Sequence, residues 1–522
     1  YRTVTFGRGQ VTGGAFTGES DILYSARWAD GRLRLFLTSF RSPESRPLGI
    51  DGMTLASISN SGELALFQGG LTSNITGSTL YRVPMNGGAP LKIDDHIMSA
   101  DWSPDGNTFA IVRAIQGSNQ IEYPAGRVLY KTAGWLSDVR VSPDGSAVAF
   151  IDHPARHDDA GDVRVWRNGT VKAVSAGWGD IDGIEWNASG DEVWFTASRS
   201  GGPSTLWAAS VGSGQTRAVT HFPTTVALMD WSYQHGGRML FANKTRRLEL
   251  SALLNGDGQE RGLTWLDWSR VVGLSADGRM VLFDESGEAV GTRPVTYVYR
   301  RETDTTVRLG EGLAQALLPG EQTALVLNAT DRRRLRIVSL AGGPDREIAP
   351  TLLKYQWVKP LPDGKSAVAS ATDSGGALGL WKISLNAVVA PVRIAASMMV
   401  RNSAVSPEGS RLAVLAPDGK LKVFSTDREA APVEIPVERR LAPLHWSLDG
   451  EWLFVQHLDM VLPASVSRVR LRTGEIRPWK TIAPGDSFGV NSVTGITIAA
   501  DEQHYAYSYR RVLSSLFAAE GW

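Results

Sequence analysis

The chain has 522 residues, and its 54 basic and 54 acidic side chains give a formal net charge of zero at pH 7. This balance excludes a bulk attraction to nucleic acid or to an anionic membrane. The chain has no cysteine, which excludes disulfides, thiolate metal sites and a cysteine nucleophile. No apolar run approaches the roughly 18 residues of a membrane span.

The sequence opens with YRTVTF, residues 1–6, a β-branched segment that we predict to be a single strand. It begins at Tyr1 without an initiator methionine or a leader pattern. We therefore expect the sequence to be a piece of a longer protein.

A strand–turn–strand pattern follows and is clearest in DWSPDGNTFAIV, residues 101–112. In its turn, Pro104 fixes φ, Asp105 hydrogen-bonds the local backbone and Gly106 accepts a positive φ. Residues 108–112 are β-branched or apolar, which is typical of a buried strand.

This turn recurs along the whole chain. Clear copies are SPDG (103–106 and 142–145), SADG (275–278), LPDG (361–364), SPEG (406–409) and SLDG (447–450). Weaker copies occupy 17–20, 59–62, 187–190, 233–237, 318–320 and 499–502. Most neighbouring copies are roughly 39 to 46 residues apart, close to the period of about 40–45 expected for four-stranded propeller blades. The last gap is longer.

Each repeat predicts four short antiparallel strands and no helix. Residues 147–152 are typical of the second strand, 205–210 of an aromatic third strand, and 216–220 of the fourth. The sequence therefore predicts an all-β fold, a β-propeller built of twelve four-stranded blades.

Two six-bladed propellers, residues 1–262 and 263–522, are the simplest partition, because rings typically have four to eight blades. No Pro/Gly/Ser-rich linker marks this boundary, so one twelve-bladed ring is the alternative. The last repeat has strands at 495–499, 505–509 and 516–519 but lacks a fourth. We expect residues 1–6 to pair with it and complete the last blade.

Aromatic and basic residues recur near these elements. We assign the tryptophans that precede or begin the turns to packing between blades: Trp102, Trp186, Trp231, Trp268 and Trp446. The triple at 332–334, Arg-Arg-Arg, predicts a solvated loop, with contact to a phosphate or an acidic ligand as the alternative. Arg510 and Arg511 are expected to pair with carboxylates at the closing blade.

The richest polar cluster is the loop Asp152-His153-Pro154-Ala155-Arg156-His157-Asp158-Asp159. A solvated loop whose aspartates cap turns explains it most simply. The alternatives are contact with a partner or ligand, for which the candidates are Asp152, His153, Arg156, His157, Asp158 and Asp159. A divalent cation is a further alternative for the same carboxylates and imidazoles.

No motif of a nucleophile elbow, zinc protease, Walker loop or dinucleotide fold is present. We expect no catalytic residues, no metal and no cofactor. Three functions stay open: a binding module, a propeller hydrolase or lyase with residues gathered around the axis, and an interaction scaffold.

The repeat resembles the WD40-like, TolB-type propeller repeat, whose turn is typically SPDG. More specific motifs resemble the C-terminal propeller region of acidobacterial serine/threonine protein kinases. They are VLYKTAGW (128–135), TWLDWS (264–269), LFDESGE (282–288), VRLGEG (307–312) and YAYSYRRVLSSLFAAEG (505–521).

In that family, a kinase domain and a membrane span precede the propeller. The resemblance implies a sensor propeller on the periplasmic or extracellular side of the cytoplasmic membrane, which binds an unknown ligand or envelope protein at one face. Kinase motifs themselves are absent from this sequence, so kinase chemistry would belong to the parent protein. A free periplasmic TolB-like scaffold is the alternative.

Overall fold

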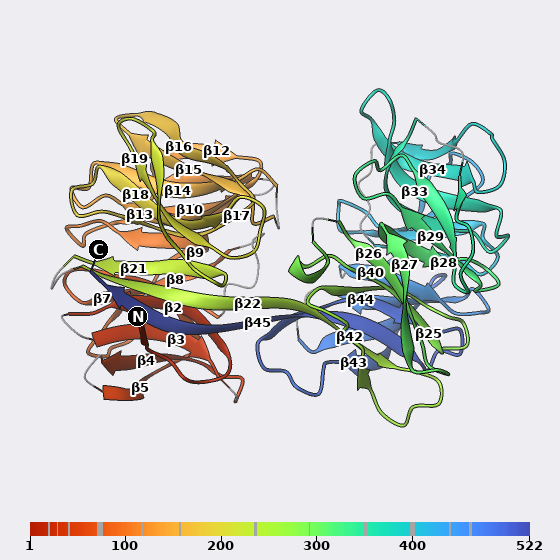
Figure 1. Cartoon of the computed structure of the whole chain (residues 1–522), viewed down its shortest axis with the longest axis horizontal. Coiled ribbons are helices and arrows are strands. Elements are labelled where there is room, and N and C mark those ends of the chain that lie inside the picture. The colour runs from red at the N-terminus through yellow and green to blue at the C-terminus, as the bar shows by residue number, and fades with distance from the viewer. Residues whose placement is uncertain are drawn as a thin grey trace. The chain divides into compact units, whose positions relative to one another are not determined.

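The computed structural model describes the chain except residues 19–20, 29, 40–41, 70–76, 116–117, 156–157, 234–236, 292, 349–351, 397–401, 438–439, 459–461 and 522. Its strands form ten sheets among these residues, and strands that follow one another within a sheet pair antiparallel (Figure 1). The helical content of the described part is one short 3-10 helix, η1 (Glu288–Val290). The predicted all-β propeller fold is therefore confirmed. Within the described residues, no helix has the length and apolar character needed to cross a membrane.

The chain divides into two compact units. Unit 1 comprises residues 1–245 and 512–522, and unit 2 comprises residues 246–511. This division differs from the predicted boundary after residue 262, because the last strand of the chain leaves unit 2 and ends in unit 1.

Unit 1 begins with one four-stranded and one seven-stranded sheet. The first contains β2 (Gln10–Phe16), β3 (Asp21–Arg27), β4 (Leu33–Ser39) and β5 (Ser42–Asp51). The second contains β6 (Met53–Ile58), β7 (Glu63–Gln68), β8 (Ser78–Pro84), β9 (Leu91–Trp102), β10 (Phe109–Ile115), β11 (Ser118–Glu122) and β12 (Val128–Thr132). Strand β9 ends one four-stranded meander and begins the next, and His96 within it has a φ of 62°.

Two further four-stranded sheets and one shared sheet complete unit 1. One four-stranded sheet contains β13 (Trp135–Val141), β14 (Ala147–His153), β15 (Gly161–Arg167) and β16 (Thr170–Trp178). The other contains β17 (Asp180–Trp186), β18 (Glu192–Ser198), β19 (Thr205–Ser210) and β20 (Thr216–His221). The shared sheet contributes β21 (Val226–Ser232), β1 (Arg2–Thr3) and parts of two long strands, β22 (Arg238–Leu253) and β45 (Tyr505–Glu520).

Unit 2 contains five four-stranded sheets. The first contains β24 (Ser269–Leu274), β25 (Met280–Glu285), β26 (Val295–Arg300) and β27 (Thr305–Glu311). The second contains β28 (Leu313–Leu317), β29 (Thr323–Leu327), β30 (Leu335–Ser339) and β31 (Arg346–Glu347). The third contains β32 (Lys354–Pro360), β33 (Ser366–Thr372), β34 (Leu378–Ser384) and β35 (Val392–Ala396). The fourth contains β36 (Ser403–Val405), β37 (Arg411–Leu415), β38 (Leu421–Ser425) and β39 (Val433–Glu434). The fifth contains β40 (Leu441–Trp446), β41 (Trp452–His457), β42 (Ala464–Arg470) and β43 (Ile476–Ile482).

The sixth group of strands in unit 2 comes from the shared sheet. Strand β44 (Val490–Ile498) pairs with the first half of β45, and β23 (Arg261–Gly262) pairs with the end of β22. Strands β22 and β45 are neighbours in this sheet (Figure 1). Each unit thus takes half of each long strand.

Strand β1 pairs with β45, where Arg2 lies opposite Ala518 and Thr3 opposite Phe517. The predicted pairing of residues 1–6 with the end of the chain is confirmed. Two details differ from the prediction. The segments 505–509 and 516–519 are one continuous strand, and the strands that β1 joins belong to unit 1.

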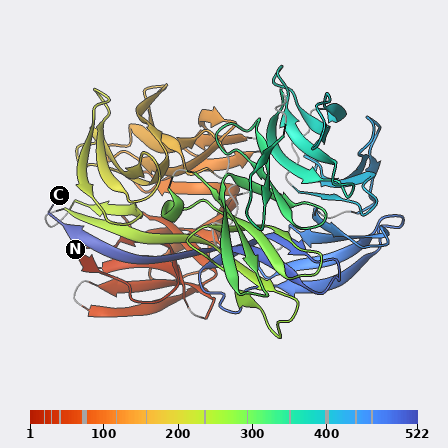
Figure 2. The same ribbon diagram turned by 45° about the vertical axis from the view of Figure 1, so that its right-hand side comes forward.

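Within unit 1, the first strands of successive four-stranded groups contact one another in a closed circle. Its order is β2, β6, β9, β13, β17, β21 and again β2. In unit 2, β36 contacts β40, β40 contacts β44, β44 contacts β24, β24 contacts β28 and β28 contacts β32. Figure 2 shows the sheets of each unit following one another around that unit's own centre. This is the arrangement of a propeller.

The repeated turn has the predicted geometry. In the copy at 103–106, the Gly106 N–H donates to the Ser103 carbonyl over 2.8 Å, and the φ of Gly106 is 69°. The Asp105 carboxylate accepts the Asn107 N–H over 3.1 Å. Three of the predicted packing tryptophans, Trp102, Trp186 and Trp446, are buried, while Trp231 and Trp268 are half-buried.

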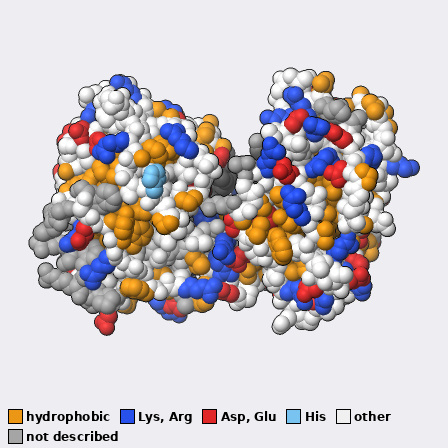
Figure 3. All heavy atoms as spheres, viewed as in Figure 1, with side chains coloured by type: hydrophobic (Ala, Val, Ile, Leu, Met, Phe, Trp, Pro, Cys, Tyr) orange, Lys and Arg blue, Asp and Glu red, His pale blue; other side chains and the backbone are white. Residues whose placement is uncertain are grey.

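Adjacent sheets are joined by hydrogen bonds from a first-strand N–H to a side chain of the neighbouring sheet. These bonds provide acceptors for N–H groups on the edge of each first strand, which has no neighbouring strand on that side. The pairs are Val11 with Ser514, Leu55 with Ser25, Leu228 with Thr196, Val271 with Ser508 and Val358 with Gln315. On the face drawn in Figure 3, basic and acidic side chains lie interspersed.

Candidate functional site

The turns fix an equivalent position in the repeats, two residues before the first turn residue. In the sixth repeat, whose turn lies partly outside the described residues, Trp231-Ser232 aligns with Trp102-Ser103, so Ser232 takes the place of the first turn residue. In eleven repeats that first residue donates its N–H to a carbonyl four or five residues later, as Ser142 does to Ala147, so the alignment of the turns is structural. We call this the pre-turn position. In unit 1 it holds Ala15, Ser57, Asp101, Arg140, Glu185 and Asp230, and in unit 2 it holds Gly273, Ala316, Lys359, Ala404, His445 and Thr497.

In unit 2, five of the six pre-turn positions line an axial channel. Two adjoining cavities occupy it, one of about 660 Å³ and one of about 760 Å³, and Val272 lines both. We call the first cavity A and the second cavity B. Gly273, Ala316 and His445 line cavity A, and Lys359 and Thr497 line cavity B.

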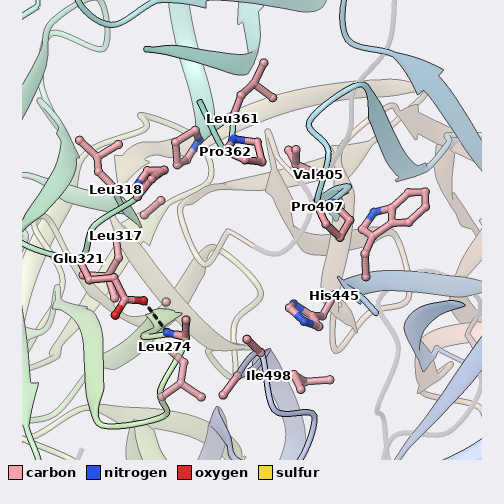
Figure 4. A pocket seen from close by; sticks show the side chains of 18 of the residues that line it. Leu274, Leu317, Leu318, Glu321, Leu361, Pro362, Val405, Pro407, His445 and Ile498 are labelled. Carbon is pink, nitrogen blue, oxygen red and sulfur yellow. Dashed lines mark hydrogen bonds between the residues drawn. The ribbon is translucent and has the colours of Figure 1, made fainter. Parts of the chain in front are cut away.

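The repeated turns form the rim of cavity A. Its lining includes the second residue of each of the six turns: Ala276, Pro319, Pro362, Pro407, Leu448 and Ala500. Figure 4 shows this cavity surrounded mainly by leucine, proline, valine and isoleucine side chains. Two groups differ, Glu321 and His445. The Glu321 carboxylate accepts the Ala276 N–H over 2.5 Å, which ties two neighbouring turns together.

His445 lies in cavity A with an Nε2 atom that is buried and has no hydrogen-bond partner among the described residues. Burial, together with the positive charge of Lys359, lowers the pKa of His445 to about 4. The imidazole is therefore neutral at pH 7, and it offers a polar atom in a mainly apolar rim.

Cavity B is polar. Its lining includes Arg270, Arg332 and Lys359 and the amides Gln315, Gln356, Asn402 and Gln456. Arg270 makes two hydrogen bonds with the Asp284 carboxylate, which is fully buried, so this charge is compensated. Gln315 is also engaged, because its side chain accepts the Val358 N–H.

Lys359 is the basic pre-turn residue of unit 2. Its ammonium group donates to the Ser403 carbonyl on the neighbouring sheet. Burial lowers the pKa of Lys359 to about 8. Water solvates an ammonium better than one carbonyl does, so the charged side chain costs stability in this position.

Unit 1 has the opposite charge at the pre-turn position. Arg140 Nε lies 2.5 Å from Glu185 Oε1, and these side chains keep 16% and 12% of their surface accessible. Asp101 accepts the Val141 N–H over 2.8 Å, and Asp230 accepts the Phe16 N–H over 2.6 Å. Glu185 thus contacts the guanidinium directly, and the charge of Arg140 also acts on Asp101 and Asp230.

Burial dominates the titration of these acids. It raises the pKa of Glu185 and of Asp101 although Arg140 opposes both shifts. It raises the pKa of Asp230 to about 6, against the hydrogen bond from Phe16 and the charge of Arg140. One or more of these carboxyls therefore holds a proton in mildly acidic solution.

The loop predicted as a candidate site is integrated into its sheet. The Asp152 carboxylate accepts the Tyr130 hydroxyl over 2.7 Å and pairs with Arg164 over 2.8 Å. Asp158 accepts the Ala160 N–H, and the Asp159 carbonyl accepts the Ile181 N–H. Arg156 and His157 lie outside the described residues.

His153 is buried in the same sheet. Its Nε2 lies 3.0 Å from the Ser137 hydroxyl and its Nδ1 2.9 Å from the Ala160 carbonyl. Its ring stacks on Trp135 with centroids 3.7 Å apart. Both ring nitrogens therefore have partners, which is the pattern of a structural histidine. Among the described residues, no group of three or more metal-ligating side chains could hold an ion.

The terminal motif at 505–511 has a structural role in unit 2. The Tyr505 and Tyr507 hydroxyls both donate to the Glu260 carboxylate, over 2.5 and 2.6 Å. Arg511 pairs with Glu249 over 2.9 Å, as expected for an arginine at the closing sheet. These contacts join strands β45, β22 and the segment after it.

Sequence reasoning did not single out Lys359, His445, Asp101, Arg140, Glu185 or Asp230. The signal that identifies them is their spacing, because each lies two residues before a repeated turn.

No family model matches the chain, and no curated protein is found to be similar to it. Among solved structures, the chain is similar to the tricorn protease with a TM-score of 0.33 and 11% sequence identity. The similarity covers 99% of this chain and 60% of that one, so the chain spans less than two thirds of that protein.

Proposed function

We propose that this chain is a non-catalytic binding propeller that takes a ligand or a protein segment into the axial channel of unit 2. The observation that carries the proposal is the channel itself. Equivalent positions of five of the six strand groups line two adjoining cavities, one with a mainly apolar rim and one with polar groups in its walls. Apolar lining with a few polar groups is typical of ligand sites.

A finer proposal places the chain in a receptor. Its motifs at 128–135, 264–269 and 505–521 resemble the sensor propeller of bacterial receptor-type serine/threonine kinases, on the outer side of the cytoplasmic membrane. The parent polypeptide is then expected to carry a kinase domain and a membrane span before residue 1. A parent without either segment contradicts the receptor and favours a free periplasmic scaffold.

The channel proposal predicts that filling the channel abolishes binding. Ala316 is half-buried at the pre-turn position of β28, and phenylalanine there would occupy space in cavity A. We expect wild-type protein to bind at least one member of a panel of acidic, basic, neutral and peptide ligands in calorimetric titrations. We expect Ala316→Phe to lower that affinity at least tenfold, on the order of 1.4 kcal/mol.

The matched control is Ala341→Phe, at an exposed turn residue of the same sheet, which should bind as wild type does. Thermal unfolding of both variants separates loss of binding from loss of fold. Equal affinities in wild type and Ala316→Phe would place the ligand elsewhere, and a panel without any bound ligand would contradict the binding function.

A further inference from the structure

Cavity B has an uncompensated positive charge. Three basic residues line it, and no aspartate or glutamate is among its described lining residues. Arg270 is neutralised by Asp284. Arg332 and Lys359 have no such partner among the ion pairs of the described residues, so the walls of cavity B have a positive excess.

Lys359 is costly where it lies. Its neighbours at the pre-turn position of unit 2 are small or neutral: Gly273, Ala316, Ala404, His445 and Thr497. The Ser403 carbonyl satisfies one of its three N–H groups. A residue that lowers stability and has no structural counter-charge is typical of a functional site.

The arginine triple adds a second observation. Its three members have different surroundings. Arg334 pairs with Glu347 over 2.6 Å, Arg333 is exposed, and Arg332 is half-buried and lines cavity B. The triple predicted as a solvated loop therefore contributes one arginine, Arg332, to the lining of cavity B.

Neutral donors complete the lining. Gln356 lies on β32 with Lys359, and Asn402 directly precedes β36, the strand of Ser403, so each amide lies close in sequence to one of these two residues. An ammonium, a guanidinium and amide groups around one cavity match the acceptor oxygens of a phosphate or carboxylate.

From this lining we infer that cavity B binds a small anion with a phosphate or carboxylate group, held by Lys359 and Arg332. This inference rests on the proposed binding function and names its ligand class. The anion supplies the counter-charge that the cavity walls lack.

The test titrates the full chain with inorganic phosphate and with citrate at constant ionic strength, with chloride as the reference anion. We expect saturable binding of one or both. We expect Lys359→Met to weaken it at least tenfold, as loss of a charge-assisted hydrogen bond does, and Arg332→Gln to weaken it several-fold. Binding of phosphate alone or of citrate alone identifies the group that is recognised.

Two substitutions serve as controls. Lys354→Met changes an exposed lysine on the same strand, and Arg333→Gln changes the exposed neighbour of Arg332, so both should bind as wild type does. Because a buried unpaired charge is removed, Lys359→Met should unfold at an equal or higher temperature at pH 7. Loss of binding then has no explanation in loss of fold.

The outcomes separate the two proposals. Unchanged anion affinity in Lys359→Met and Arg332→Gln overturns the inference. Absence of phosphate and citrate binding also overturns it, while a neutral or cationic ligand whose binding is lost in Ala316→Phe leaves the binding function standing. A ligand panel without any binding overturns both.

Discussion

Asp230 shows how a single residue at the pre-turn position links charge to stability. Its folded-state pKa of about 6 is above the ordinary 3.8, because burial disfavours the charged form. The folded state then binds a proton more tightly than the unfolded state, so the ionised carboxylate costs stability, and this cost appears as pH rises through about 4 to 6.

Asp230→Asn should therefore stabilise unit 1 at pH 8 and have little effect at pH 4. Two pKa units correspond to about 3 kcal/mol, and because the side chain keeps accessible surface we expect about 1–2 kcal/mol. Asparagine retains an oxygen that accepts the Phe16 N–H. Urea unfolding at both pH values measures the effect, and a stabilisation of equal size at both would contradict it.

Asp105→Asn is the contrasting control. Hydrogen bonds from the Ser103 and Asn107 side chains lower the pKa of Asp105, so its stabilising contribution is present at neutral pH and lost as pH falls through that lowered pKa. This substitution should destabilise at pH 8 and lose its effect in strong acid, opposite in sign to Asp230→Asn.

At this scale the sequence could predict less about the site than about the turns. The Arg triple and the loop at 152–159 attracted attention because their polar residues are consecutive. The pre-turn residues that line the channel are about 40 residues apart in the sequence. Lys359 is a single charged residue among them, and the equivalent residue of the two preceding repeats is glycine or alanine. Only the register that the turn sets brings them together.

At the scale of elements, the turn and the N-terminal strand were predictable from local chemistry. Pro-Asp-Gly defines its own backbone conformation, and a repeat with three strands leaves an unpaired edge. The continuity of β45 was missed, although residues 510–515 contain no Pro or Gly that would break a strand; the period of four short strands led to the prediction of a break there.

Deletion of residues 1–6 should destabilise unit 1. The deletion removes the hydrogen bond from the Val4 N–H to the Leu516 carbonyl and the one from the Leu516 N–H to the Thr5 hydroxyl, each 2.8 Å long. It also exposes the surface that buried Val4 covers. Two net hydrogen bonds and one buried valine predict a loss of about 2–4 kcal/mol.

Denaturant unfolding of the full chain and of residues 7–522 measures this loss, and hydrogen exchange at Phe517 should rise. Phe6→Ser is the control, because Phe6 is 71% exposed and the substitution leaves the pairing intact. Unchanged stability of the deletion would mean that β1 contributes nothing to the edge of β45.

At the scale of the whole molecule, the two long strands decide which part of the chain can fold independently. A linear division at residue 262 removes the second half of β22 and β23 from unit 2. That segment contributes Leu250, Ala252 and Leu254, all fully buried in the core of the sheets that contain Val271 and Phe283.

The fragment 246–511 should therefore fold, whereas the fragment 263–522, of nearly equal length, should not. The second fragment lacks two buried leucines, worth about 1.5–3 kcal/mol each. It also removes Glu249 from buried Arg511, which keeps Asp486 at 3.4 Å as its remaining carboxylate partner. We expect a cooperative thermal transition and dispersed amide resonances for 246–511 and neither for 263–522. A fragment 263–522 that unfolds as cooperatively as 246–511 would show that β22 is dispensable to unit 2.

The same comparison shows which fragment can carry the channel. The first strands that line the channel, β24, β28, β32, β36, β40 and β44, are present in both fragments. Only the strands that close the unit differ between the two fragments, so a fragment that folds should retain the channel.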